Sequence, residues 1–116
     1  MRDEPLTVTA QSGLHEGTTI LVLRGPLTLQ NTFDFQKDLA QHKPALLILD
    51  LTESPYMDSA GLGLLMNVHV SAEKNGRRLL LAGANHRITA LLETTKVNQI
   101  LKNYATAADA EASVPA

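Results

Sequence analysis

Hydrophobic and polar positions form four patterns along the chain that predict β-strands. The first segment alternates apolar and polar residues with a period of two, which is typical of a strand with one face in water. The second is β-branched at its start and is closed by Gly25 and Pro26. The last two are almost wholly apolar, as expected for strands covered on both faces. The four segments are 6–10, 18–24, 46–51 and 79–82, and a weaker fifth candidate is 100–104.

Helical spacing of apolar residues predicts helices between these strands. In the first, Phe35 and Leu39 form an i,i+4 pair on one face. Asn31 is expected to cap the start of this helix, and Thr106 the start of the last. Gly76 stands where a left-handed residue ends a helix. The predicted helices cover 31–42, 60–75, a short segment that begins at Asn85, and 107–113.

The order of these elements indicates an α/β fold. The loop 12–17 predicts a hairpin and therefore an antiparallel edge. Two strand–helix–strand crossovers, 18–51 and 46–82, imply parallel pairing with helices packed against the sheet. We therefore expect a single α/β domain with a mixed four- to five-stranded sheet. Its expected boundaries are 1–116 for the domain, about 6–104 for the core and about 107–113 for a short final helix, with frayed ends, including 114–116.

Composition narrows the function classes. Of the 116 residues, 44% are hydrophobic and 3% aromatic, so Leu, Ile, Val and Ala must build the core. The 10 basic and 12 acidic residues give a net charge of −2, without the basic excess or the aromatic rings of a nucleic-acid-binding surface. Cysteine is absent, which excludes disulfides, thiolate metal sites and thiol catalysis, and fits a reducing compartment.

The chain also lacks recognisable targeting signals. Its start, 1–5, has no apolar region of the kind that a secretory signal peptide needs. The longest apolar runs, such as 45–49, are far shorter than the roughly 18 residues that cross a bilayer. We therefore expect a cytoplasmic protein with no direct membrane insertion.

The most informative segment is 57–63, Met-Asp-Ser-Ala-Gly-Leu-Gly, between the third predicted strand and the second long helix. It follows the carboxyl end of a strand, where open α/β sheets place their sites, and the helix N-terminus there favours an anion. The partial positive charge at this helix N-terminus would therefore tolerate a phosphoryl group on the Ser59 hydroxyl. Gly61 and Gly63 each cost roughly 0.5–1 kcal/mol in a helix relative to alanine, which requires a reason. A simpler interpretation stays open, in which Asp58 or Ser59 is only an N-cap and the glycines relieve crowding.

The hexapeptide Asp58-Ser59-Ala60-Gly61-Leu62-Gly63, preceded by an apolar strand, resembles the signature of the STAS domain. This family includes anti-sigma factor antagonists and the end domains of sulfate transporters. The resemblance covers about 6–104 and includes Gly25 and the strand 79–82 with Gly83. It implies a non-enzymatic regulatory module in transcription. The unphosphorylated protein would bind an anti-sigma factor that is also a serine kinase of the histidine-kinase-like ATPase type, and the phosphorylated protein would release it.

The resemblance also implies roles for individual residues. Ser59 is the expected phosphoacceptor, and a PP2C-type phosphatase is a further expected partner. Phosphorylation adds about −1.5 to −2 charges beside Asp58 and disfavours docking. Many family members carry an acidic pair in a Gly-Glu-Leu-Asp turn, where this chain has Gly25-Pro26-Leu27-Thr28, so a different partner or a loss of regulation stays open. The expected partner-binding residues are Asp58, Ala60, Gly61, Leu62, Gly63 and Thr28.

Two other function classes fit parts of this pattern. The chain could be the STAS subunit of a membrane transport complex, such as a lipid transporter, in which the same surface docks a partner without phosphorylation. A hydrolase would use Ser59 as nucleophile, but 57–61 matches neither the Gly-Asp-Ser-Gly-Gly nor the Gly-x-Ser-x-Gly motif, although spacing alone does not exclude His86 as its base. The four histidines lack the spacing of a helical metal pair. We therefore expect no enzymatic activity, no metal and no cofactor.

Overall fold

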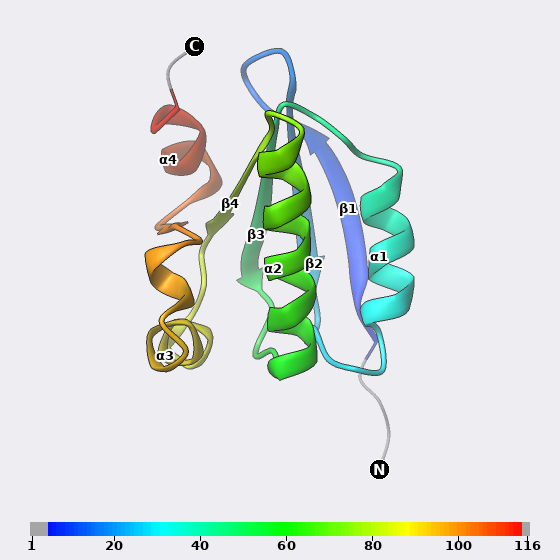
Figure 1. Cartoon of the computed structure of the whole chain (residues 1–116), viewed down its shortest axis with the longest axis vertical. Helices are drawn as coiled ribbons and strands as arrows, with labels where there is room; N and C mark the ends of the chain where they lie inside the picture. The colour runs from blue at the N-terminus through cyan, green and yellow to red at the C-terminus, as the bar shows by residue number, and fades with distance from the viewer. Residues whose placement is uncertain (1–4, 115–116) are drawn as a thin grey trace.

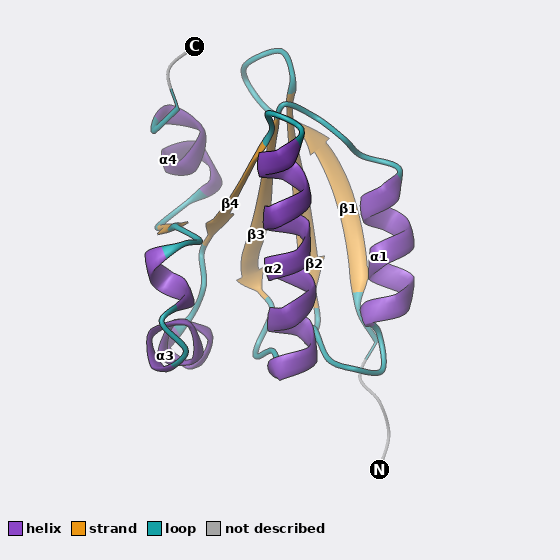
Figure 2. Cartoon of the chain, viewed as in Figure 1, coloured by secondary structure: helices purple, strands orange, loops and turns teal. Residues whose placement is uncertain are grey.

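The five strands of the computed structural model lie side by side in chain order in one mixed sheet (Figures 1 and 2). β1 is antiparallel to β2, and the pairs β2–β3, β3–β4 and β4–β5 are parallel. The structure describes residues 5–114. The strands are β1 (Thr7–Ser12), β2 (Thr18–Arg24), β3 (Leu46–Glu53), β4 (Arg78–Ala82) and β5 (Asn103–Tyr104). The helices are α1 (Thr32–Ala40), α2 (Ser59–Lys74), α3 (His86–Thr94), the 3₁₀ helix η1 (Val97–Gln99) and α4 (Ala107–Ala112).

Helices cover both faces of the sheet, as the apolar strands predicted. α1 and α2 pack beside each other on one face (Figure 1). Because side chains alternate along a strand, Leu47 and Leu49 of β3 enter the large core beneath these helices. Leu46 and Ile48 enter a smaller core on the opposite face, where Ala110 of α4 packs. The single mixed α/β sheet expected from the sequence is confirmed.

Most predicted elements are confirmed, with small shifts at their ends. β2 has the predicted bounds, and α2 begins at Ser59 rather than Ala60. Thr106 accepts a hydrogen bond from the Asp109 amide and caps α4, and Gly76 has a φ of +70°. Of the final residues 114–116, which were expected to be frayed, Val114 packs against the smaller core, and the other two lie outside the described residues.

One local prediction is wrong and another is only partly confirmed. The fifth strand contains only Asn103 and Tyr104, because the chain forms η1 just before it and turns to bury Leu101 in the large core. Asn31 precedes α1 but makes no side-chain hydrogen bond to that helix. Its side chain instead forms hydrogen bonds with the Thr28 amide and the Pro26 carbonyl, in the loop between β2 and α1. These partners compete with the amides of the helix for the same side chain.

A buried carboxylate links the C-terminal helix to the hairpin between β1 and β2. Glu111 of α4 is 3% exposed and accepts hydrogen bonds from the Leu14 amide (3.0 Å), the His15 amide (2.7 Å) and the His15 Nδ1 (2.9 Å). Burial acts to raise the pKa of Glu111, but these hydrogen bonds outweigh it and the pKa is lowered. These hydrogen bonds connect parts of the chain that are 96 and 97 positions apart in the sequence. They help to fix α4 on the sheet.

We expect Glu111→Gln to lower the melting temperature at pH 7 by several degrees, because the neutral amide loses charge-assisted hydrogen bonds. A group with a lowered folded-state pKa stabilises the protein above its unfolded pKa, near 4.5, and this contribution is lost as the pH falls through the folded value. Thermal unfolding monitored by circular dichroism between pH 7 and 3 should therefore show wild type and variant converging at acid pH. The exposed Glu16, on the same hairpin, provides the control Glu16→Gln. A difference that stayed constant with pH would contradict the role of the charge.

Candidate functional site

Ser59 is the first residue of α2, at the end of the sheet where β3 terminates (Figure 1). Its side chain is exposed. No hydrogen bond holds its hydroxyl among the residues that the structure describes. The strand–loop–helix context predicted for the segment 57–63 is therefore confirmed, and the hydroxyl is accessible to a modifying enzyme or a partner.

Asp58 caps α2 and at the same time joins it to a neighbouring loop. Its Oδ1 accepts a hydrogen bond from the Gly61 amide at 2.9 Å, as an N-cap does. Its Oδ2 accepts one from the Leu29 amide at 3.1 Å, in the loop between β2 and α1. The cap was predicted from the sequence, but the bond to Leu29 was not. Through these two bonds, Asp58 holds the first turn of α2 and the loop between β2 and α1 together next to Ser59.

The loop between β2 and α1 is fixed by bonds within itself and to the segment before Ser59. The Asn31 side chain accepts from the Thr28 amide at 2.9 Å and donates to the Pro26 carbonyl at 2.7 Å. The Leu27 amide donates to the Tyr56 carbonyl, and the Asp58 amide donates to the Leu27 carbonyl, both at 3.2 Å. Half-buried Thr28 is thereby placed in the loop that Asp58 contacts.

The two glycines of the hexapeptide serve different purposes. A Cβ on Gly61 would lie 2.5 Å from the Leu27 carbonyl oxygen, so only glycine lets the helix approach this loop so closely. A Cβ on Gly63 would meet nothing within 4 Å. Gly61 is buried, whereas Gly63 is exposed. The expectation of a structural reason therefore holds for Gly61, and Gly63 leaves open surface beside Ser59.

The structure places the expected partner-binding residues at different depths. Asp58, Ala60 and Thr28 are half-buried, while Ser59 and Gly63 are exposed. Leu62 is only 6% exposed and packs in the large core, so its side chain is not positioned to contact a partner. This corrects the expectation for Leu62, whose place in the first turn of α2 directs it toward the sheet.

Two exposed apolar side chains, one in the loop that Asp58 contacts and one in the first turn of α1, were missed. Leu29 and Phe33 are each 67% exposed, and the Leu29 amide is bound to Asp58. Phe33 lies in the first turn of α1, where the Lys37 ammonium lies 4.6 Å from its ring centroid. The apolar Leu29 could be read from the sequence, but its exposure became visible only in the fold. We call Leu29, Phe33, Asp58 and Ser59 the Ser59 surface.

Among the described residues, Ser59 has no histidine bonded to it, and no cluster of metal ligands is present. Both Asp58 oxygens accept backbone amides, and no hydrogen bond among the described residues connects Ser59 with a histidine. Within residues 5–114, no three His, Cys, Asp or Glu side chains come together to hold a metal ion. None of the described helices has the length and hydropathy needed to cross a membrane.

Comparison with known proteins gives one family match and related sequences. A family model described as the STAS domain matches residues 10–110. An anti-sigma-B factor antagonist of Listeria monocytogenes is 37% identical over 57 residues, which are 49% of this chain and 50% of that protein. The chain spans about half the length of the curated relatives it matches.

Solved structures share the fold over nearly the whole chain. An anti-sigma factor antagonist from Mycobacterium paratuberculosis has a TM-score of 0.79 at 16% identity, with 97% of this chain and 98% of that chain covered. A sulfate transporter family protein from Wolinella succinogenes has a TM-score of 0.73 at 24% identity, with 89% and 88% covered. At these identities the likeness establishes the α/β fold.

We predict opposite effects for the two glycine-to-alanine substitutions. Gly61→Ala should destabilise the protein by about 1–3 kcal/mol, because the added methyl group collides with the Leu27 carbonyl. Gly63→Ala should stabilise it by about 0.5–1 kcal/mol, because alanine favours the helix and its methyl group meets open space. Urea unfolding at equilibrium measures both values, and each variant is the matched control of the other. Equal effects of the two substitutions would contradict the close approach at Gly61.

Proposed function

This chain belongs to the STAS domain family, and we propose that it is a regulatory binding module of the anti-sigma factor antagonist type, switched by phosphorylation of Ser59. The observation that carries the proposal is the exposed Ser59 hydroxyl at the start of α2, beside a carboxylate fixed by two backbone amides. The names of the curated relatives support the regulatory role.

The position of Ser59 suits a phosphorylated residue in the free protein. The start of a helix carries a partial positive charge from its unpaired amides, which favours an anion there. Because the hydroxyl is exposed, a kinase can reach it without unfolding the helix, and water can solvate the added phosphate. Phosphorylation would therefore leave the fold intact and change mainly the surface.

The Ser59 surface has features suited to protein docking. Leu29 and Phe33 present large apolar side chains, and complete burial of such a side chain contributes roughly 1.5–3 kcal/mol. A partner that covers Leu29 would also cover Ser59, because Asp58 holds Leu29 against the start of α2. The proposed partner is an anti-sigma factor of the histidine-kinase-like ATPase type, and a PP2C-type phosphatase would reverse the modification, both in the cytoplasm.

The sign of the switch follows from the charges at this surface. Phosphorylation adds about −1.5 to −2 charges next to the Asp58 carboxylate. Asp58 cannot swing away, because each of its oxygens accepts a backbone amide. In a dry interface the two anions would repel each other and lose solvation. The unmodified protein would therefore bind, and the phosphorylated protein would dissociate.

A second candidate function uses the same surface without phosphorylation. The neutral Thr28 occupies a position where many family members carry an acidic residue, which favours a partner other than the kinase. The chain would then be the STAS subunit of a membrane transport complex and would dock a nucleotide-binding subunit. Phosphorylation assays distinguish the two functions.

We expect a kinase of the histidine-kinase-like ATPase type from the same organism to phosphorylate Ser59 in the presence of ATP. Peptide mapping by mass spectrometry should place a single phosphate on Ser59, and Ser59→Ala should remain unmodified. The control is Ser71, which is exposed on the same helix and should carry no phosphate. Phosphate found only at other residues would contradict the proposed acceptor.

Affinity capture with variants tests whether the charge at Ser59 controls binding. Wild type, Ser59→Ala and the control Ser71→Asp should retain the kinase partner, whereas Ser59→Asp should weaken its binding by roughly tenfold or more, since a like charge in a buried interface costs at least about 1.4 kcal/mol. Circular dichroism checks that each variant is folded. Equal retention of the partner by Ser59→Asp and Ser71→Asp would exclude the switch and favour phosphorylation-independent docking.

A further inference from the structure

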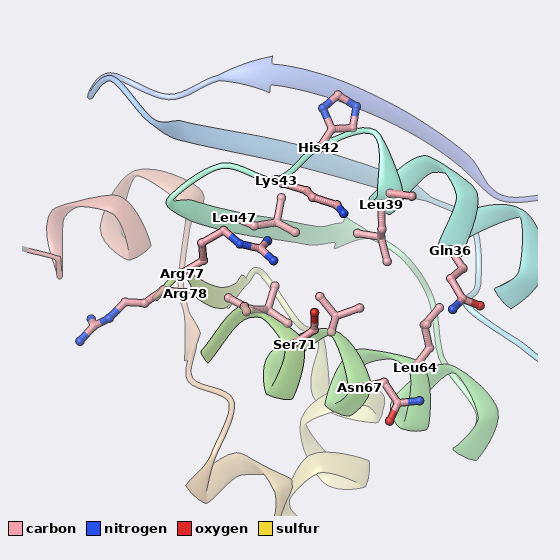
Figure 3. Close-up of a pocket in the computed structure, with 14 residues that line it drawn as sticks. Gln36, Leu39, His42, Lys43, Leu47, Leu64, Asn67, Ser71, Arg77 and Arg78 are labelled. Carbon is pink, nitrogen blue, oxygen red and sulfur yellow. The ribbon is translucent and has the colours of Figure 1, made fainter. Parts of the chain in front are cut away.

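A cavity of about 210 Å³ lies between α1 and α2 and extends from Gln36 and Leu64 toward the C-terminal ends of the two helices (Figure 3). Its lining residue Ser71 follows Ser59 by 12 residues along α2, which corresponds to about 18 Å of helix. None of the residues that line the cavity belongs to the Ser59 surface. A ligand bound there would act independently of the proposed switch.

The inner wall of the cavity is apolar. It is formed by Leu39 of α1, Leu47 of β3, Leu64 of α2 and Leu79 of β4, all of them at most 8% exposed. An apolar cavity of about 150 Å³ accommodates a benzene molecule. This one is large enough for a single aromatic ring or a short alkyl chain.

The mouth of the cavity is cationic. The Lys43 ammonium, the Arg77 guanidinium and the Ser71 hydroxyl are directed into the same space (Figure 3). None of the described residues that line it is acidic, although the whole chain has more acidic than basic residues. Among the described residues, neither Lys43 nor Arg77 forms an ion pair or a side-chain hydrogen bond, in contrast to Arg24, which pairs with Glu53 at 3.1 Å.

Lys43 and Arg77 do not serve as hydrogen-bond donors to the last carbonyls of the two helices. The last carbonyls of α2 already accept hydrogen bonds from the backbone, since the Asn75 and Arg77 amides donate to Ala72 and the Gly76 amide to Glu73. At the end of α1, the Gln41 and His42 amides satisfy carbonyls in the same way. The Lys43 and Arg77 side chains donate to none of these carbonyls. Their charges face the cavity without a partner among the described residues.

We propose that this cavity binds a small apolar carboxylate. The apolar part of the ligand, about one aromatic ring in size, would lie against the four leucines, where burial of its surface contributes to affinity. Its carboxylate would meet Arg77, whose planar guanidinium matches both carboxylate oxygens, and Lys43 would add a second positive charge. The Ser71 hydroxyl can donate one further hydrogen bond.

Amide chemical shifts of the ¹⁵N-labelled full chain test this proposal. Titration with benzoate should give saturable shifts at residues lining the cavity, such as those in 39–43 and 77–79, and none at Ser59. Benzyl alcohol, which has the ring without the charge, and acetate, which has the charge without the ring, should both bind at least tenfold more weakly. Arg77→Gln should weaken benzoate binding roughly tenfold, because it removes a charge-assisted hydrogen bond.

Arg78→Gln is the matched control, with the same change in charge at the next residue. Arg78 also lines the cavity, but the alternation of β4 turns its side chain to the opposite face from Leu79, and its guanidinium is directed away from Lys43 and Arg77 (Figure 3). This variant should bind benzoate like wild type. The spectrum of each variant shows whether it is folded. Equal binding of benzyl alcohol, equal losses in the two variants, or the absence of saturable shifts at the cavity would each overturn the proposal. None of these results would bear on Ser59.

Discussion

The geometry of the Ser59 surface depends on one carboxylate that serves two pieces of backbone. Asp58 receives the Gly61 amide from the first turn of α2 and the Leu29 amide from the loop between β2 and α1. This arrangement requires the loop and the helix to lie very close, and the absence of a side chain at Gly61 makes that possible beside the Leu27 carbonyl. Asp58 and Gly61 therefore act together. The cap defines where α2 begins, and the close contact defines what stands next to Ser59.

Features encoded within a few residues were predictable from the sequence, whereas those that depended on competing partners were not. The caps at Asp58, Asn85 and Thr106 each use an amide three residues later, so the local pattern is sufficient. Asn31 has the same residue type, but the Thr28 amide and the Pro26 carbonyl are also within its reach and take its side chain. A local pattern cannot decide between two such sets of partners.

Long-range packing set the remaining limit on what the sequence could predict. Ser59 and Asp58 could be identified because both lie in one hexapeptide, and the parallel sheet fixes where that hexapeptide emerges. The exposure of Phe33 was decided by α1, which buries Phe35 and leaves Phe33 on its outer side. The role of Glu111 depends on amides almost the whole chain away. The helical period could place Phe33 opposite Phe35, but no periodicity indicates the partners of Glu111.

The magnitude of a phosphorylation switch must come mainly from the complex rather than from the free protein. A negative charge at an exposed helix N-terminus is stabilised by only about 0.3–1 kcal/mol, which is less than a tenfold change in affinity. A larger change requires a partner that removes water from Ser59 and holds the phosphate against Asp58. The apolar side chains of Leu29 and Phe33 give a partner a reason to cover this point, because their burial is favourable only when water is excluded. The same contact that creates affinity would thus make the added charge costly, so binding strength and sensitivity to phosphorylation would be coupled at the Ser59 surface.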